Sequence, residues 1–201
     1  MSDFKVKTSI PILIVVVLSS FYAAAQDHFP QANAKWDFSI WVAGETGEET
    51  TNSFAQSQIV SAGAFAGKPI TGEVGNGWRR GSLEYGFDIM PIFITANNQS
   101  VRGGGFDPVI LRWNSSLRTS RFAPYVELSG GGVATTANLP PGNTSNFNFM
   151  AKGGGGIYVF TTKRQSFDIA FQWSHISNAN LGIQNPEFNG LQLRLGYHWY
   201  K

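Results

Sequence analysis

Apolar and polar side chains alternate along several stretches of the chain after residue 35, each roughly ten residues long. A period of two places successive side chains on opposite faces of a β-strand, and ten residues suffice for a tilted strand that crosses a membrane. No stretch after residue 35 keeps the helical period of 3.6 residues. The pattern predicts an all-β protein.

Eight stretches are candidate strands. The four with the clearest alternation are 36–43, 83–90, 166–177 and 191–200. Four weaker candidates, bounded by Gly, Pro, Asn or Ser, are 58–66, 105–113, 123–133 and 147–160. One face of each clear stretch is apolar and the other is polar or small, which is the reverse of a soluble barrel with a dry core. We therefore expect an eight-stranded antiparallel transmembrane β-barrel, whose narrow interior is filled by side chains.

Composition agrees with a wall that faces hydrocarbon. Charged residues make up 14% of the chain and aromatic residues 14%, whereas about 25% of the residues in a soluble domain are charged. Aromatic side chains form girdles at both interfaces of outer-membrane barrels. A soluble sandwich with many buried aromatic residues is the alternative.

The N-terminal residues predict export. Lys5 and Lys7 precede an apolar run over 10–22, and small residues at 23–25 follow it. These are the features of a secretory signal peptide. We expect cleavage after residue 25, which leaves an outer-membrane barrel domain over 26–201. A retained membrane anchor is the alternative, which Pro11 near the start of the run disfavours.

Charge and cysteine content exclude several kinds of partner. Without Lys5, Lys7 and Asp3, the chain keeps 13 basic and 12 acidic residues, so no strong field attracts nucleic acid. The absence of Cys excludes disulfides and thiolate metal sites. The three histidines are scattered, and His28 is expected to be solvated. We predict neither a metal site nor a cofactor.

The polar faces of the predicted strands carry charges of both signs. We expect a salt-bridged plug inside the barrel, with His198 beside Arg194. Its members are Asp37, Glu84, Asp88, Asp168, Arg112 and Arg194. Six basic residues are predicted between strands, as solvated turns or as contacts to lipid phosphates. They are Arg79, Arg80, Arg118, Arg121, Lys163 and Arg164.

A histidine and a serine stand two residues apart at the end of the 166–177 stretch. In an extended strand His175 and Ser177 leave on the same face, about 6.6 to 7 Å apart along the chain. An imidazole can bridge that gap and take the hydroxyl proton as a general base. The pair continues the apolar series that ends at Trp173, so we expect it to face lipid. By itself, however, a His-x-Ser pair is better explained by ordinary interfacial hydrogen bonds.

The longer string around this pair resembles the lipid A 3-O-deacylase family, the PagL-type barrels that are also known as acyloxyacyl hydrolases. Its members look like an eight-stranded barrel that ends in a His-x-Ser-Asn-Ala strand, an Asn-Pro loop and a last strand with Gly-Tyr. The matching residues are His175, Ser177, Asn178, Ala179, Asn185, Pro186, Asn189, Gly196 and Tyr197. The motif match covers residues 173–199.

The resemblance implies an outer-membrane esterase that removes the ester-linked 3-O acyl chain of lipid A, the lipid part of lipopolysaccharide. Ser177 would be the nucleophile and His175 the base. Asn185, ten residues after the His, and Asn178 would help to hold the oxyanion. Such a donor contributes ~2.7 to 4 kcal/mol to transition-state stabilisation.

The third member of the triad departs from the family pattern. The best-known member carries Glu fourteen residues after its His, where this chain has Asn189. An amide can orient an imidazole, as in Cys-His-Asn enzymes, but it brings no full charge. Glu187, two residues earlier on the same alternating face, is the other candidate, and of the two we favour Asn189.

Other functions remain open on the sequence alone. A non-catalytic barrel that anchors, adheres or stiffens the envelope would fit the same strand pattern, as would full loss of activity in a structural barrel. A soluble lipocalin-like carrier in the periplasm is a third class. A homodimer is also left open by the sequence.

Overall fold

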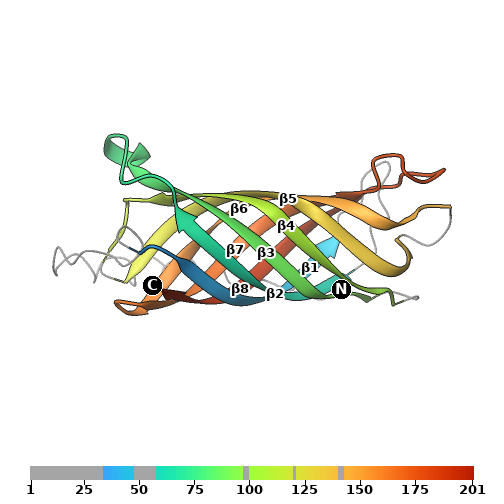
Figure 1. Ribbon diagram of the computed structural model, residues 1–201, viewed down its shortest axis with the longest axis horizontal. Coiled ribbons are helices and arrows are strands. Elements are labelled where there is room, and N and C mark those ends of the chain that lie inside the picture. Colours follow the sequence, from blue (N-terminus) through green and yellow to red (C-terminus); the bar gives the residue numbers. More distant parts are fainter. Residues whose placement is uncertain (1–33, 48–57, 97–99, 120, 140–142) are drawn as a thin grey trace, which may run out of the picture.

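Eight antiparallel strands close into a barrel (Figure 1). The computed structural model describes residues 34–47, 58–96, 100–119, 121–139 and 143–201. Each strand pairs with its sequence neighbours, and β8 pairs with β1. The strands are β1 Asp37–Gly47, β2 Gln58–Pro69, β3 Gly81–Ala96, β4 Arg102–Ser115, β5 Phe122–Leu139, β6 Ser145–Thr162, β7 Gln165–Ser177 and β8 Phe188–Tyr200. The prediction of an all-β, eight-stranded antiparallel barrel is confirmed.

The described residues contain one short 3-10 helix, η1 Gly77–Arg79. No helix in these ranges has the length and apolar character needed to cross a membrane. The predicted signal peptide, 1–25, and His28 lie outside the described residues.

Several strands run further than the sequence pattern indicates. The predicted stretch 83–90 continues as β3 to Ala96, and 123–133 continues as β5 to Leu139. In β3 the register shifts between Met90 and Phe93. A bulge adds a residue to one strand and so breaks the alternation, which makes the pattern end before the strand does.

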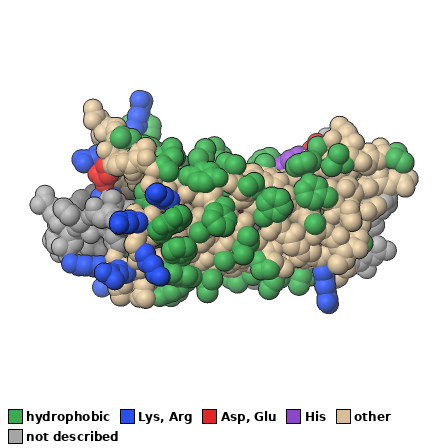
Figure 2. Space-filling model, viewed as in Figure 1, with side chains coloured by type: hydrophobic (Ala, Val, Ile, Leu, Met, Phe, Trp, Pro, Cys, Tyr) green, Lys and Arg blue, Asp and Glu red, His purple; other side chains and the backbone are tan. Residues whose placement is uncertain are grey.

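The outer wall of the barrel is apolar. Every strand carries exposed large hydrophobic side chains that alternate with buried residues; Ile40, Leu128 and Phe171, for example, are exposed by about half or more. Figure 2 shows hydrophobic side chains as a band across the middle of one face of the barrel. A contiguous apolar surface of this kind is typical of a barrel in a bilayer.

Ion pairs fill much of the interior. Arg112, which is 1% exposed, makes ion pairs with Glu127 at 2.5 Å and with Asp37 at 3.4 Å. Arg194 makes ion pairs with Glu127 at 3.0 Å and with Asp168 at 3.7 Å. Buried charges are tolerated when they are paired and hydrogen-bonded. The predicted plug is therefore present, and Glu127, which the prediction omitted, lies at its centre.

The structure adds one detail to the predicted plug and differs from the prediction in another. His198 points into the interior, as predicted, and its ring lies between two carboxylates, with Nδ1 2.8 Å from Asp37 and Nε2 3.1 Å from Asp168. Asp88 is buried but makes none of the ion pairs seen in the described residues. The ion-pair network forms without Asp88, because Glu127 pairs with the guanidinium groups of both Arg112 and Arg194.

The glycine run of β6 makes room for this interior. A Cβ at Gly156 would lie 2.6 Å from the ring of Tyr125, whose hydroxyl donates to Asp168. Gly154 would collide with the backbone of β7. Glycine at these positions lets the interior side chains and the neighbouring backbone approach closely.

The two ends of the barrel differ in charge. The six basic residues predicted between strands lie in the connections β2–β3, β4–β5 and β6–β7, at the end where β8 finishes. Figure 2 shows basic side chains gathered at one end of the apolar band. The β7–β8 connection, which follows Ser177, lies at the opposite end.

Candidate active site

The site is built at the end of β7 and the start of β8. Along β7, Phe171 and Trp173 are exposed, whereas Gln172 and Ser174 are buried. His175 and Ser177 follow the exposed series and are themselves half-buried. They are thus polar positions at the end of an otherwise apolar outer row.

Strand pairing brings a third residue to this pair. In the β7–β8 register Asn189 stands opposite His175. Directly opposed residues of an antiparallel pair have Cβ atoms about 4.5 to 5.5 Å apart. Asn189, fourteen positions away in the chain, is therefore the neighbour of the imidazole.

A chain of hydrogen bonds joins the three side chains. Oγ of Ser177 lies 3.1 Å from Nε2 of His175, and Nδ1 of His175 lies 2.9 Å from Oδ1 of Asn189. A carbonyl oxygen can only accept a hydrogen bond, so the contact with Asn189 requires the proton on Nδ1. That tautomer leaves Nε2 free to accept the hydroxyl hydrogen of Ser177.

The imidazole is also held by an aromatic neighbour. The ring of Trp173 stacks on that of His175, with centroids 5.9 Å apart and an interplanar angle of 21°. Stacking fixes the plane of the imidazole, while the two hydrogen bonds fix its rotation. A base held in this way is oriented toward the serine before any substrate binds.

The β7–β8 loop begins with a tight reversal. Ala179 and Asn180 both have positive φ, 49° and 63°. Asn tolerates this left-handed region, but Ala rarely adopts it. Such backbone conformations persist where the surroundings enforce them, and they gather at functional sites.

Asn178 and Asn185 hold the loop together. The backbone N–H of Asn178 donates to Oδ1 of Asn185 at 2.9 Å, and its side-chain amide donates to the carbonyl of Gln184 at 2.8 Å. Asn178 is 1% exposed. The N–H of Gln184 in turn donates to the carbonyl of Asn143 in the β5–β6 connection. The loop is thus fastened both internally and to its neighbour.

The candidate residues fall into three groups. His175, Ser177 and Asn189 come together in one hydrogen-bonded chain. Asn185 and Asn178 bond to each other beside it. Glu187 is half-buried. Both ring nitrogens of His175 are bound to Asn189 and Ser177, and the Glu187 carboxylate accepts no hydrogen bond from His175.

The described part of the chain holds no group of three or more His, Asp or Glu that could bind a metal ion.

Comparison with known proteins identifies the family. A family model described as lipid A 3-O-deacylase (PagL) matches residues 70–198, which is more than half of the chain. The chain belongs to the lipid A 3-O-deacylase (PagL) family. The resemblance drawn from the sequence motif is confirmed, and the matched region contains all the candidate site residues.

Two solved structures resemble this barrel. The crystal structure of the outer membrane enzyme PagL is 15% identical, with a TM-score of 0.56, and the alignment covers 80% of this chain and 97% of that one. The crystal structure of Neisserial surface protein A (NspA) is 13% identical, with a TM-score of 0.59, and covers 84% and 98%. At these identities the likeness shows the fold alone. A search of curated proteins finds no significant match.

The sequence pattern does not reveal two contributors to this candidate site. The alternation marks Trp173 only as an apolar wall residue, although its ring stacks on that of His175. Gln184 lies outside the predicted set of site residues, although its backbone joins the loop to Asn178 and to Asn143. The position of Trp173, two residues before His175 on the same face, is the signal that could have revealed the first. No sequence pattern marks the second.

Proposed function

We propose that this protein hydrolyses the ester-linked 3-O acyl chain of lipid A, with Ser177 as the nucleophile and His175 as the general base. The observation that carries the proposal is the hydrogen-bonded chain Ser177–His175–Asn189 at the end of an outward row of side chains. Membership of the lipid A 3-O-deacylase family supports the choice of substrate.

The reaction follows from the positions of the protons. Nε2 of His175 takes the hydroxyl proton as Oγ of Ser177 attacks the ester carbonyl. The imidazolium then gives this proton to the sugar oxygen as its bond to the acyl carbon breaks. Water, activated by the same imidazole, releases the fatty acid and regenerates Ser177.

Asn189 is the proposed orienting group. Its Oδ1 holds the Nδ1 proton, which keeps Nε2 available to the serine. This is the role of the acid in a Ser-His-Asp triad, without the charge that stabilises the imidazolium. The contact with His175 favours Asn189 over Glu187 as the third member.

We assign the oxyanion to Asn185 and not to Asn178. Asn178 is buried, and its amide donates to the loop carbonyl of Gln184. Asn185 is half-buried, and the bond from Asn178 to its Oδ1 fixes the orientation of its amide group. An amide donor held in place before reaction stabilises a developing negative charge without reorganisation.

Expression in a bacterial host of known lipid A tests the proposal. The wild-type protein should remove one acyl chain, seen by mass spectrometry as loss of that chain and as a free fatty acid. Ser177→Ala and His175→Ala should each lower the rate by a factor of at least ~10³, because triad members act as a unit. Ser100→Ala, an exposed serine at the same end of the barrel, is the control.

Two results would contradict the proposal. Unaltered lipid A in cells that contain folded wild-type protein would favour a non-catalytic barrel that anchors or stiffens the envelope. Deacylation by Ser177→Ala at the wild-type rate would remove the serine from the mechanism.

A further inference from the structure

The connection between β2 and β3, residues 70–80, projects from the side of the barrel. It includes η1 and lies at the end where β8 finishes. In Figure 1 this connection extends sideways beyond the strands, at the end of the barrel that is marked C. It therefore stands at the margin of the apolar outer wall, where a membrane-spanning barrel meets the lipid headgroups.

Backbone hydrogen bonds hold this connection in a defined shape. Val74 and Gly81 exchange two of them, of 2.8 and 3.0 Å. The N–H of Ser116, in the β4–β5 connection, donates to the carbonyl of Arg80 at 2.8 Å. Gly75 has a positive φ of 87°, which glycine adopts without strain. A connection fastened in this way presents its side chains at fixed positions.

Large apolar side chains are exposed on and beside this connection. Trp78 is 71% exposed, and Ile70, Val74 and Leu117 are each about half exposed. A Trp ring is apolar but carries one polar N–H, so it suits the boundary between lipid and water, where Trp is enriched. The exposed ring therefore favours a position of this surface among lipid headgroups over a position in bulk water.

Basic side chains surround the exposed ring. The guanidinium group of Arg79 lies 5.0 Å from the centroid of the Trp78 ring. Among the described exposed or half-buried residues of this end, Glu73 is the single acidic one, and it pairs with Arg80 and Arg118. Four further cations of the connections make no ion pair with a described residue. They are Arg79, Arg121, Lys163 and Arg164.

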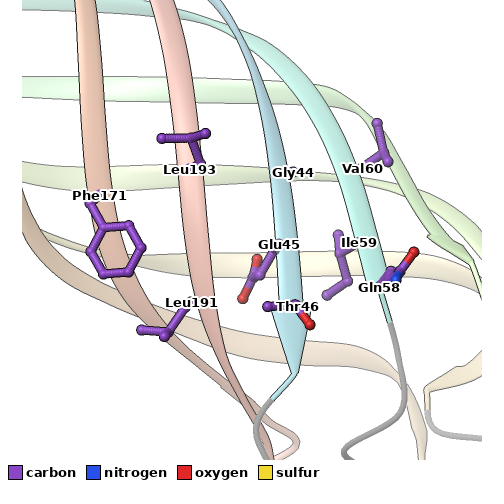
Figure 3. A pocket seen from close by; sticks show the side chains of 9 residues that line it. All are labelled: Gly44, Glu45, Thr46, Gln58, Ile59, Val60, Phe171, Leu191 and Leu193. Atoms are coloured by element: carbon purple, nitrogen blue, oxygen red, sulfur yellow. The ribbon is translucent and has the colours of Figure 1, made fainter. Parts of the chain in front are cut away.

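The opposite end of the barrel carries little charge on its outer face. Thr46 and Gln58, on the wall where β1 ends and β2 begins, are neutral (Figure 3). Outside the interior, Arg102 and Glu187 are the charged residues that the structure describes there. Positive charge is therefore concentrated at the end away from Ser177, and a partner of opposite charge is expected at that end.

We propose that Trp78, Arg79, Arg121, Lys163 and Arg164 form a basic patch that binds the headgroups of anionic phospholipids, in the leaflet opposite to the one that meets Ser177. The partner is a lipid because the exposed apolar side chains adjoin the wall that contacts membrane hydrocarbon. The headgroup is anionic because a cluster of cations is attracted to net negative charge, whereas the ammonium group of a zwitterionic headgroup cancels the charge of its phosphate. This inference does not depend on the hydrolase function.

The basic patch combines two kinds of contact. Attraction between exposed charges falls off over a Debye length, about 8 Å at physiological ionic strength, so the cations must be held close to the headgroups, as those beside the fixed connection are. Insertion of the Trp78 ring into the interface depends little on headgroup charge. Substitutions of the cations and of Trp78 should therefore have different effects on the choice of lipid.

Lipid titration of the purified, refolded protein in detergent micelles tests the proposal. Native mass spectrometry measures the Kd of phosphatidylglycerol, which is anionic, and that of phosphatidylethanolamine, which is zwitterionic. The wild type should prefer phosphatidylglycerol about tenfold or more, and the combined variant Arg79→Gln/Arg121→Gln/Lys163→Gln/Arg164→Gln should bind both lipids about equally. Raising the concentration of ammonium acetate should also reduce the preference.

Arg102→Gln is the matched control for a single charge. Arg102 is exposed, as Arg79 is, but it lies at the start of β4, at the opposite end of the barrel. Arg79→Gln should lower the preference about threefold, whereas Arg102→Gln should keep the wild-type ratio of the two Kd values. Trp78→Ala should weaken both lipids by a similar factor. Heat-dependent mobility in gel electrophoresis establishes that each variant is a folded barrel.

Three results would overturn the proposal. The first is equal affinity of the wild type for the two lipids, and the second is an unchanged preference in the folded combined variant. The third is binding of soluble peptidoglycan fragments, abolished in the combined variant, by a wild type that shows no preference between the lipids. That outcome would assign the basic patch to the cell-wall polymer. None of these measurements requires hydrolysis, so failure of the proposed function would leave the proposal standing.

Discussion

The barrel carries linked polar side chains on both its inner and its outer face, and the two sets differ in their charged groups. Inside, Arg112 and Arg194 share Glu127, and each has a second carboxylate nearby. Outside, the chain from Ser177 through His175 to Asn189 contains no carboxylate. The inner set compensates charge and holds the strands together, whereas the outer set orients one imidazole and can move a proton. Substitutions in the inner set should lower the stability of the fold, whereas substitutions in the outer set should change the rate of hydrolysis.

The largest effect is expected inside the barrel. Arg112→Leu would leave Glu127 and Asp37 without their shared guanidinium, and removing one partner of a buried ion pair costs about 3 to 5 kcal/mol. Denaturant unfolding in lipid vesicles, followed by tryptophan fluorescence, measures the loss. Hydrolysis per folded molecule should stay at the wild-type level.

Arg102→Leu supplies the control, because Arg102 is an exposed arginine on the same strand. Its unfolding free energy should change far less. A wild-type stability for Arg112→Leu would mean that the interior network is dispensable and that the two faces do not differ as described.

Substitutions in the outer set should change the rate of hydrolysis and leave the stability of the fold unchanged. Asn189→Glu would place a carboxylate opposite His175, where it can stabilise the imidazolium. We expect kcat to rise about tenfold, equivalent to ~1.4 kcal/mol of transition-state stabilisation. Asn189→Leu removes the acceptor for the Nδ1 proton and should lower kcat by a similar factor or more. Both are measured on refolded protein with one lipid A substrate.

Glu187→Gln separates the two candidates for the third position. Since the structure gives the Glu187 carboxylate no contact with His175, its neutralisation should leave kcat within about twofold of wild type. A large loss with Glu187→Gln and none with Asn189→Leu would reverse the assignment.

The sequence was sufficient wherever a local pattern determines the outcome. Alternation over 166–177 and 191–200 predicted strands and their faces, and the spacing of His175 and Ser177 predicted a shared face. Strand ends were missed at bulges, as at Met90, because the extra residue destroys the period. The predicted plug omits Glu127, although the alternation along β5 places this residue inside the barrel. The glycine run that follows Glu127 obscures the alternation.

Features that depend on closing the barrel could not be predicted. Gly44 and Leu193 become neighbours only because β1 pairs with β8, and the register of that pair is set by the whole circumference. The contact between His175 and Asn189 needs the β7–β8 register, which the length of the loop alone does not fix. In both cases the residue types are visible in the sequence, but only the folded barrel brings the residues next to each other.

A third group of ion pairs lies in water at the basic end of the barrel. Its loss should have the smallest effect on the free energy of unfolding. Glu73, in the β2–β3 connection, makes ion pairs with Arg118 at 2.5 Å and with Arg80 at 2.9 Å. Burial by itself raises the pKa of Glu73, but the two guanidinium groups outweigh it and hold the pKa below its ordinary value. Solvent screens such pairs, so Glu73→Gln should cost less than about 1 kcal/mol at neutral pH.

The pH dependence of that small loss follows from the direction of the pKa shift. A carboxylate whose folded pKa is depressed contributes its full stabilisation above the unfolded value, and loses it as pH falls through the folded value. Unfolding free energies of wild type and Glu73→Gln should therefore differ at neutral pH and converge in acid. High salt should also narrow the difference, because these charges are solvent-accessible. A difference that persisted in acid and in salt would show that packing, and not charge, links Glu73 to its arginines.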